Sequence, residues 1–101
     1  MRVEFHPEAR LEFRESAAFY KERDEGLGFA FAKEIESVLT MIQAAPERWR
    51  CIEEDVRRCL VQRFPYGLLY TIEPDFILIV AVMHCSRKPG YWRNRVPGRS
   101  S

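Results

Sequence analysis

The sequence predicts an α+β domain: a short N-terminal strand, an antiparallel helix hairpin, and then a three-stranded antiparallel meander, with the helices packed on one face of the sheet. Up to about residue 45, apolar side chains recur every three to four positions, which is the period of an amphipathic helix. From residue 57 onward, runs rich in Val, Ile, Leu, Phe and Tyr are separated by turns that contain Pro or Gly, which is typical of strands. Helices followed by strands indicate the α+β class.

The N-terminal half is expected to form one strand and two helices. Residues 3–5 are a short strand candidate, and Pro7 then suits the first position of a helix that we expect to span residues 7–23. The segment Asp24-Glu25-Gly26 ends this helix, and the second helix runs from Leu27 to about Ala45. Because so few residues join them, the two helices are expected to pack as an antiparallel hairpin.

The C-terminal half is expected to form three strands, over Arg57–Phe64, Leu68–Glu73 and Phe76–Met83. Pro65-Tyr66-Gly67 and Glu73-Pro74-Asp75 have the composition of turns. Two tight connections in succession imply that neighbouring strands pair antiparallel.

The last of these strands carries no polar side chain on either face, although an antiparallel sheet with one solvated face normally shows alternation. Strict alternation divides its side chains into two sets, Ile77, Ile79, Ala81 and Met83 on one face and Leu78, Val80 and Val82 on the other. The hairpin covers only one face. We therefore expect the second face to be covered either by the C-terminal segment around Tyr91 and Trp92 or by a partner chain.

Composition limits the class of protein. A chain of 101 residues with 47% hydrophobic residues is expected to form a single globular domain over residues 1–101, with 96–101 as a flexible tail. No apolar run approaches the roughly 18 residues of a membrane span, and the N-terminus lacks the apolar region of a signal peptide. The three cysteines are odd in number and widely spaced, which indicates reduced thiols in a cytoplasmic protein. We expect no metal and no cofactor.

Charge is distributed unevenly along the chain, although the net charge is only +1. Residues 1–46 hold six Lys/Arg and nine Asp/Glu, whereas residues 47–101 hold ten and six. The apolar strand runs into His84. All charged side chains after His84 are cations, and none is a carboxylate. A basic surface of this kind attracts an anionic partner even when the whole molecule is nearly neutral.

Six short motifs occur in order along the chain. They are Phe5-His6-Pro7-Glu8-Ala9, Ala17-Ala18-Phe19-Tyr20, Val56-Arg57-Arg58, Arg63-Phe64-Pro65-Tyr66 with Leu69-Tyr70, Ile79-Val80-Ala81-Val82 with His84, and Arg87-Lys88-Pro89-Gly90-Tyr91-Trp92. Over about residues 2–95 the chain thus resembles the RelE/ParE superfamily of toxins from bacterial type II toxin–antitoxin systems. The resemblance implies a cytoplasmic toxin with a role in plasmid stabilisation, held by a cognate antitoxin in a hetero-oligomer. It also implies that a disordered part of the antitoxin folds over the toxin.

The superfamily contains two activities, so the fold alone does not choose the target. RelE-like members cut mRNA in the ribosomal A site, whereas ParE-like members poison DNA gyrase and have no hydrolytic site. Metal-independent RNA cleavage needs a base, an acid, and cations for the phosphate charge. For an endoribonuclease, the candidate catalytic residues are His84, Arg58, Arg87 and Tyr91.

Two departures favour the ParE-like activity. RelE-like nucleases carry an arginine directly after the tyrosine that opens the second meander strand, whereas Gly67 follows Tyr66 here. They also carry two lysines along the preceding strand; Arg58 can replace the first, but Leu60 stands at the second. Each missing cation removes transition-state stabilisation. A ParE-like gyrase inhibitor is therefore the first hypothesis, an mRNA endonuclease the alternative, and a non-toxic binding domain of the same fold the third.

The expected surface for the target or the antitoxin lies at the basic end of the sheet and comprises Arg58, Arg63, His84, Arg87, Tyr91, Trp92 and Arg93. Two of these residues also have purely structural interpretations. His84 at a strand end suits a local hydrogen bond, and Trp92 suits a lid over the sheet. Arg87 is the strongest functional candidate, because it lies between the apolar strand and Pro89 and matches a superfamily position.

Overall fold

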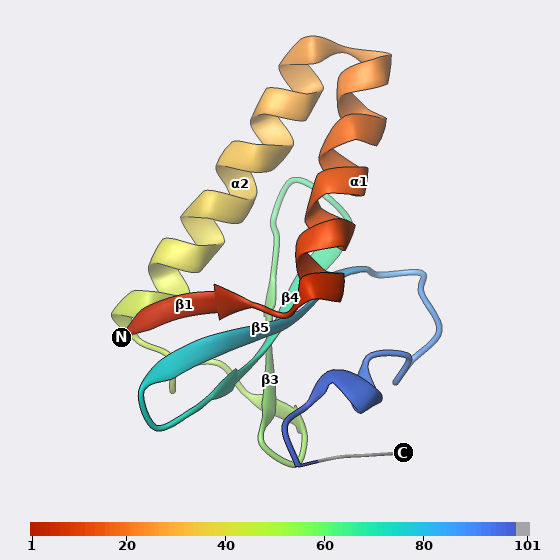
Figure 1. Cartoon of the computed structure of the whole chain (residues 1–101). Helices are drawn as coiled ribbons and strands as arrows, with labels where there is room; N and C mark the ends of the chain where they lie inside the picture. Colours follow the sequence, from red (N-terminus) through yellow and green to blue (C-terminus); the bar gives the residue numbers. More distant parts are fainter. Residues whose placement is uncertain (99–101) are drawn as a thin grey trace.

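The computed structural model describes residues 1–98, which form two helices, a five-stranded sheet and one 3-10 helix (Figure 1). In chain order the elements are β1 (Arg2–Phe5), α1 (Pro7–Arg23), α2 (Glu25–Ala44), β2 (Cys51–Glu53), β3 (Val56–Leu60), β4 (Tyr66–Ile72), β5 (Phe76–His84) and the 3-10 helix η1 (Arg93–Arg95). The two helices pack on one face of the sheet, and the C-terminal segment packs on the other.

The two helices form the antiparallel hairpin that the sequence predicted. Local capping interactions set the start of α1 and the turn between the helices. The ring of His6 caps α1: its Nδ1 accepts the backbone N–H of the second helical residue at 3.1 Å. Asp24 lies between the helices, and its carboxylate caps α2 by accepting the N–H of Gly26 at 2.7 Å. At Gly28, a Cβ would lie 2.7 Å from the Cβ of Lys21, so the close approach of the helices requires glycine at this position.

The sheet is mixed, with strand order β1-β5-β4-β3-β2, which corrects the expected three-stranded antiparallel meander. β3, β4 and β5 do pair antiparallel as neighbours. However, β1 runs parallel to β5, with Arg2–Phe5 opposite residues 76–79, and the connection between them contains the helix hairpin and the strands β2–β4. β2 was not predicted, because three residues are too few to show a strand period. β3 ends at Leu60, so residues 61–64 form a loop where strand was expected, and β4 begins at Tyr66, within the expected turn.

The larger core cluster lies between the hairpin and the sheet. Phe31 is fully buried at its centre, with its ring centroid 4.9 Å from that of Tyr66 and 5.2 Å from that of Tyr20. Tyr70 is also fully buried and donates its hydroxyl to the carbonyl oxygen of Pro46 at 2.6 Å. Burial raises the pKa of Tyr70 to about 12. These contacts hold β4 against the helices along most of its length.

A second, smaller cluster covers the opposite face of the sheet and comprises Val56, Leu69, Val80, Ala81, Met83, Trp92 and Val96. Trp92 is only 3% exposed and Val96 only 4% exposed. The sequence left two possible coverings for this face, the C-terminal segment or a partner chain. The C-terminal segment covers it, and Trp92 packs over the sheet as predicted. Val96 is packed although it belongs to the expected tail; residues 99–101 of that tail lie outside the described residues.

A β-bulge in β5 changes which residues face the helices. Leu69 pairs with Ala81 while the next residue of β4 pairs with Ile79, so Val80 is an extra residue in β5. The expected strict alternation therefore holds up to Val80 and is wrong from Ala81 onward. Ala81 belongs to the smaller cluster, and Val82 to the larger one. Because of this switch, the side chain of His84 lies on the helix-facing side of the sheet. There it packs against Tyr66, the residue with which it pairs on β4.

Removing the lid tests the packing of the smaller cluster. Trp92→Ala is expected to lower the free energy of unfolding by about 3–5 kcal/mol, because it leaves a large cavity under the sheet. The matched control is Leu60→Ala, whose side chain is 53% exposed and whose removal should change stability by about 0.5 kcal/mol or less. Urea denaturation followed by circular dichroism measures both. Equal small changes would show that the C-terminal segment does not pack on the sheet.

Candidate functional site

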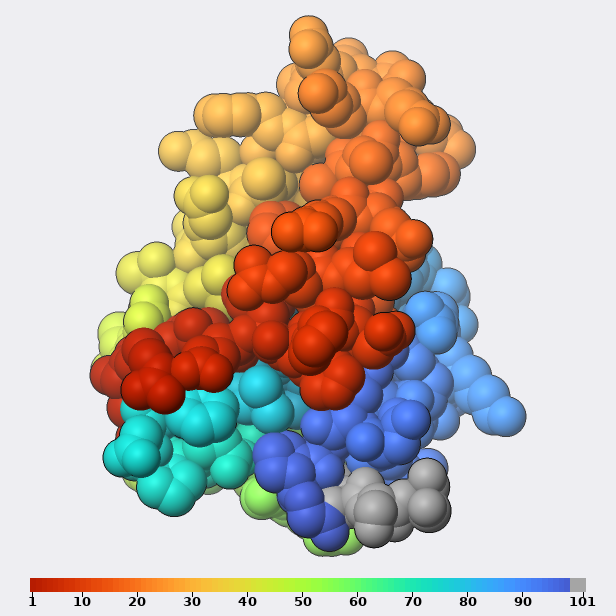
Figure 2. All heavy atoms as spheres, in the orientation of Figure 1, coloured from red at the N-terminus to blue at the C-terminus, as the bar shows by residue number. Residues whose placement is uncertain are grey.

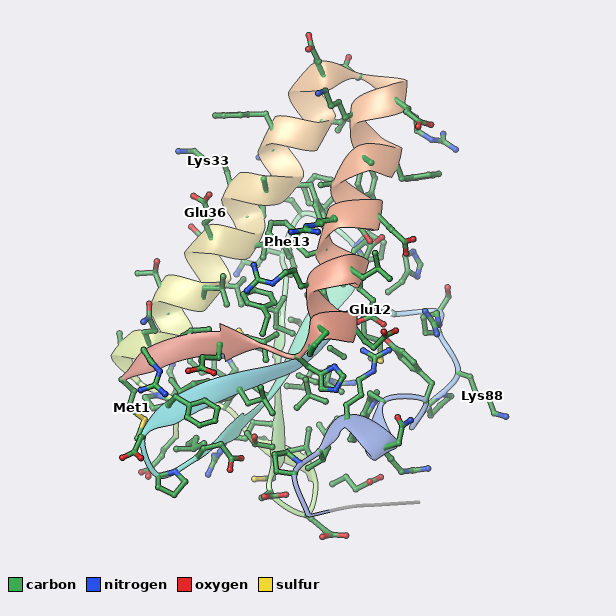
Figure 3. All side chains as sticks on the ribbon, viewed as in Figure 1. Met1, Glu12, Phe13, Lys33, Glu36 and Lys88 are labelled. Atoms are coloured by element: carbon green, nitrogen blue, oxygen red, sulfur yellow. The ribbon has the colours of Figure 1, made fainter. Side chains whose placement is uncertain are left out.

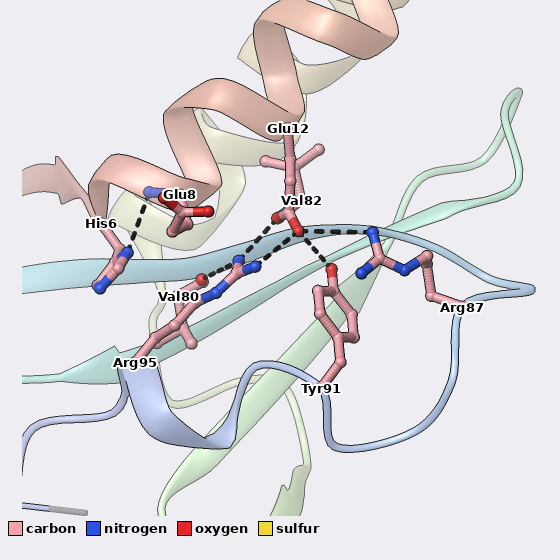
Figure 4. Close-up of polar contacts among 8 residues, drawn as sticks. All are labelled: His6, Glu8, Glu12, Val80, Val82, Arg87, Tyr91 and Arg95. Atoms are coloured by element: carbon pink, nitrogen blue, oxygen red, sulfur yellow. Dashed lines mark hydrogen bonds and ion pairs between the residues drawn. The ribbon is translucent and has the colours of Figure 1, made fainter. Parts of the chain in front are cut away.

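The site begins at an edge of β5 that has no neighbouring strand. β1 pairs with β5 only as far as Ile79, whose carbonyl oxygen accepts the N–H of His6 at 2.9 Å. Beyond this point, two side chains take the hydrogen bonds that a strand would make (Figure 4). Glu12 accepts the backbone N–H of Val82 at 3.0 Å, and Arg95 donates to the carbonyl oxygen of the bulge residue Val80 at 3.2 Å. Backbone groups of the edge are thereby satisfied without another strand.

Glu12 and Arg95 also bind each other as a bidentate pair. The two guanidinium nitrogens of Arg95 each lie 3.0 Å from one carboxylate oxygen of Glu12. The side chains of Glu12 and Arg95 are only 13% and 10% exposed. Tyr91 donates its hydroxyl to the same carboxylate at 2.7 Å. One carboxylate on α1 therefore holds two side chains of the C-terminal segment, as Figure 4 shows.

Tyr91 in turn supports Arg87. The guanidinium carbon of Arg87 lies 3.9 Å from the centroid of the Tyr91 ring, and its Nη1 lies 4.0 Å from the Glu12 carboxylate. The side chain of Arg87 nevertheless remains 51% exposed. Burial, and then the hydrogen bond to Glu12, raise the pKa of Tyr91 well above its ordinary value. The Tyr91 hydroxyl is thus fixed as a protonated donor, and Arg87 is the member of the group that solvent reaches.

Three arginines from separate segments border one hollow of about 250 Å3, which we call the three-arginine hollow: Arg58, Arg87 and Arg93. Trp92 and Met83 line it from the smaller core cluster. Arg93 is already paired: its guanidinium makes three hydrogen bonds of 2.7–3.0 Å to the carboxylate of Glu53.

Gly90 makes this arrangement of Arg93 possible. Its φ is +80°, and a Cβ at this position would overlap the guanidinium of Arg93. Glycine therefore satisfies both the backbone conformation and the close approach of the arginine.

His84 lies outside the three-arginine hollow. It borders a separate hollow of about 190 Å3 on the helix-facing side, together with Glu12, Tyr66 and Arg87. Its ring packs edge-on against Tyr66 at 5.0 Å, and its Nδ1 accepts the N–H of Ser86 at 3.0 Å. Among the described residues that were predicted to form the site, only Arg87 borders both hollows.

The structure therefore separates part of the predicted site. Arg58, Arg87, Trp92 and Arg93 line the three-arginine hollow, with Tyr91 directly behind Arg87. Arg63 lies exposed on the loop between β3 and β4 and lines neither hollow in the described chain.

Sequence reasoning did not identify Glu12, Arg95 or Glu53 as parts of the site. The one available signal was the place of Glu12 on α1, between Ala9 and Phe13, which pack in the core. Figure 3 labels Glu12 and Phe13 on this helix. A carboxylate beside an apolar stripe requires a partner when the helix packs. Nothing in the sequence identifies that partner, because Arg95 follows 83 residues later.

A larger hollow of about 770 Å3 lies between the two helices near their turn, and it was not predicted. Small residues of both helices line it, together with Arg14 and Lys21 of α1 and Glu25 and Phe29 of α2. Phe29 is 68% exposed. Figure 2 shows that this end of the hairpin projects beyond the rest of the molecule. We call this surface the hairpin groove.

Within residues 1–98, no group of three or more His, Cys, Asp or Glu side chains is arranged to hold a metal ion. In the same part of the chain, no helix has the length and apolar character needed to cross a membrane.

Comparisons with known proteins identify relatives of the whole fold. Residues 3–89 match the family model for the ParE toxin of the type II toxin–antitoxin system parDE. The fold is similar to a solved structure described as the chromosomal ParDE TA system from P. aeruginosa, with a TM-score of 0.70 and 18% sequence identity over 83% of this chain and 95% of that chain. No curated protein sequence matches.

The buried pair predicts a large effect of a small change. Glu12→Gln is expected to lower the free energy of unfolding by about 3 kcal/mol, because it leaves the buried guanidinium of Arg95 without its counter-charge. Glu15→Gln, an exposed carboxylate on the same helix, is the control and should be nearly neutral. Thermal and urea unfolding measure both. If Glu12→Gln were no more destabilising than the control, the pair would not hold the C-terminal segment.

Proposed function

Because the chain belongs to the ParE toxin family of type II toxin–antitoxin systems, we propose that it inhibits growth by binding an essential target through the three-arginine hollow. The observation that carries this proposal is the grouping of Arg58, Arg87 and Arg93 around one hollow from which the candidate acid–base residue, His84, is excluded. Such an arrangement suits recognition of an anionic group better than proton transfer to it. The proposed site of action is the cytoplasm, and the proposed role is maintenance of the plasmid or module that encodes the toxin.

DNA gyrase is the proposed target, on the strength of the superfamily resemblance. The alternative target, mRNA on the ribosome, is less well supported by the geometry. A nuclease needs an acid and a base beside its phosphate-binding cations. Here the Tyr91 hydroxyl is committed to Glu12, and the Nδ1 of His84 is committed to Ser86. At Gly67, a Cβ would lie 3.3 Å from the Arg58 side chain, so the position of the nuclease arginine is filled from β3.

We further propose that the antitoxin binds the hairpin groove. A partner chain was one of the two possible coverings of the second face of the sheet, but the C-terminal segment covers it. The hairpin groove retains exposed apolar surface, including Phe29. Arg14, Lys21 and Glu25 line the same groove, which leaves one positive charge in excess, so the complementary partner is an apolar segment that also carries acidic side chains. A neutralising antitoxin that orders on binding fits this description.

Toxicity should depend on the exposed arginine of the hollow. Arg87→Ala is expected to reduce growth inhibition strongly while leaving thermal stability nearly unchanged, because its side chain is half exposed. Arg63→Ala, which removes an exposed arginine outside the hollow, should remain toxic. Colony counts after induced expression, with protein levels checked by blotting, measure the effect. Equal toxicity of both variants and the parent chain would exclude this binding surface.

The target itself is distinguished by two assays on the purified protein. An inhibitor of gyrase alters the supercoiling of plasmid DNA by gyrase and leaves mRNA intact in a translating extract. Truncated mRNA in that extract, with normal supercoiling, would replace the proposed function with the nuclease alternative.

Neutralisation should depend on the hairpin groove and not on the arginines. Phe29→Asp is expected to remain toxic but to escape the antitoxin, because it places a carboxylate where an apolar and acidic segment would dock. Met41→Asp changes an exposed apolar residue of α2 outside the groove and serves as the control. Co-expression with the antitoxin measures rescue of growth. Full rescue of the Phe29 variant would place the antitoxin elsewhere.

A further inference from the structure

The three-arginine hollow already contains one carboxylate, and its geometry indicates what else binds there. Glu53 accepts three hydrogen bonds from Arg93 within the hollow, so a carboxylate side chain fits against this surface. Two further guanidiniums, those of Arg58 and Arg87, border the same space. With one of the three positive charges balanced by Glu53, the hollow retains an excess of positive charge for an incoming anion.

Neighbouring residues restrict the side chains of both Arg58 and Arg87. The aliphatic part of Arg58 runs beside Gly67, with its Cγ 3.3 Å from where a Cβ of residue 67 would lie. The guanidinium of Arg87 lies on the ring of Tyr91, which Glu12 holds by its hydroxyl. Less side-chain freedom is therefore lost when an anion binds, and this favours affinity.

The surface lacks what recognition of nucleic acid bases requires. Single-stranded nucleic acid is usually held by exposed aromatic rings on which bases stack. Trp92 lines the hollow but is only 3% exposed, and the ring of Tyr91 is covered by Arg87 and lies 5.0 Å from the guanidinium of Arg95. Within residues 1–98, no other aromatic side chain lines this hollow.

The rim has instead the composition of a protein interface. Ile52 lines the hollow and is 38% exposed, and Leu60, two residues from Arg58 on β3, is 53% exposed. Arginines beside exposed apolar side chains are typical of the residues that dominate binding between proteins. The hollow is also smaller than the roughly 300–1,000 Å3 of pockets that enclose a whole small ligand. It suits the end of a single acidic side chain.

We propose that the three-arginine hollow binds the carboxylate of an acidic residue that is flanked by apolar residues on a partner protein, and not the phosphodiester backbone of a nucleic acid. The inference rests on the proposed function and adds the chemistry of the partner. Arg58 and Arg87 contact the incoming carboxylate, Arg93 stays with Glu53, and Ile52 and Leu60 contact the apolar neighbours.

Two probes of equal net charge test this inference with the full chain. One is a short synthetic peptide that carries Glu-Leu pairs in a Gly/Ser background, and the other is a single-stranded RNA. Fluorescence anisotropy measures affinity, and the Nε–H signals of the arginines in NMR spectra identify the contacts. We expect tighter binding of the peptide, shifts of Arg58 and Arg87, and a weakening of about tenfold on Arg58→Ala or Arg87→Ala, the loss of one charged hydrogen-bonding partner. Arg63→Ala, the control, should bind the peptide as the parent chain does.

Tighter binding of the RNA, or peptide binding that is indifferent to Arg58→Ala and Arg87→Ala, would overturn the inference. Toxicity assays of the same variants separate this failure from failure of the proposed function. Loss of toxicity in Arg87→Ala with unchanged peptide binding overturns only the identity of the ligand. Retained toxicity with lost peptide binding overturns the role of the hollow in growth inhibition.

Discussion

The ion pair between Glu12 and Arg95 is the contact on which the rest of this structure depends. Each charge is largely removed from water, so each needs the other. The same two side chains satisfy the open edge of β5, at Val82 and Val80. They also connect α1, the sheet and the C-terminal segment, which are far apart in the sequence. Together with the hydrogen bonds between Arg93 and Glu53, the pair holds Trp92 and Val96 in place over the second face.

The three-arginine hollow on the surface is a consequence of how the C-terminal segment packs on the sheet. Arg95 balances the charge of Glu12, and Arg87 remains as an additional cation beside the pair. Folding of the C-terminal segment across the sheet also brings Arg87 and Arg93 next to Arg58 on β3. The basic hollow is therefore a consequence of covering the sheet. Within the described residues, the chain itself covers both faces of the sheet.

Sequence reasoning succeeded where the determining interactions are local. The helix hairpin follows from the apolar period and from caps such as Asp24, and the apolar strand β5 is evident from its composition. It failed where the structure depends on distant pairing. The bulge at Val80 carries no residue signature, yet it reverses the facing of every later residue of β5 and moves His84 away from the arginines. The contact between Glu12 and Arg95 joins residues 83 apart, and no spacing rule predicts it.

Hydrogen exchange at the backbone amide of Val82 reports on this pair. The amide has no strand partner on its side of β5, and its hydrogen bond goes to the Glu12 carboxylate. If the pair holds the C-terminal segment on the sheet, this amide should exchange as slowly as amides that bond within the sheet, because exchange requires the segment to open. Exchange at the rate of a solvent-exposed edge amide, in an otherwise protected sheet, would show that the pair does not organise this surface.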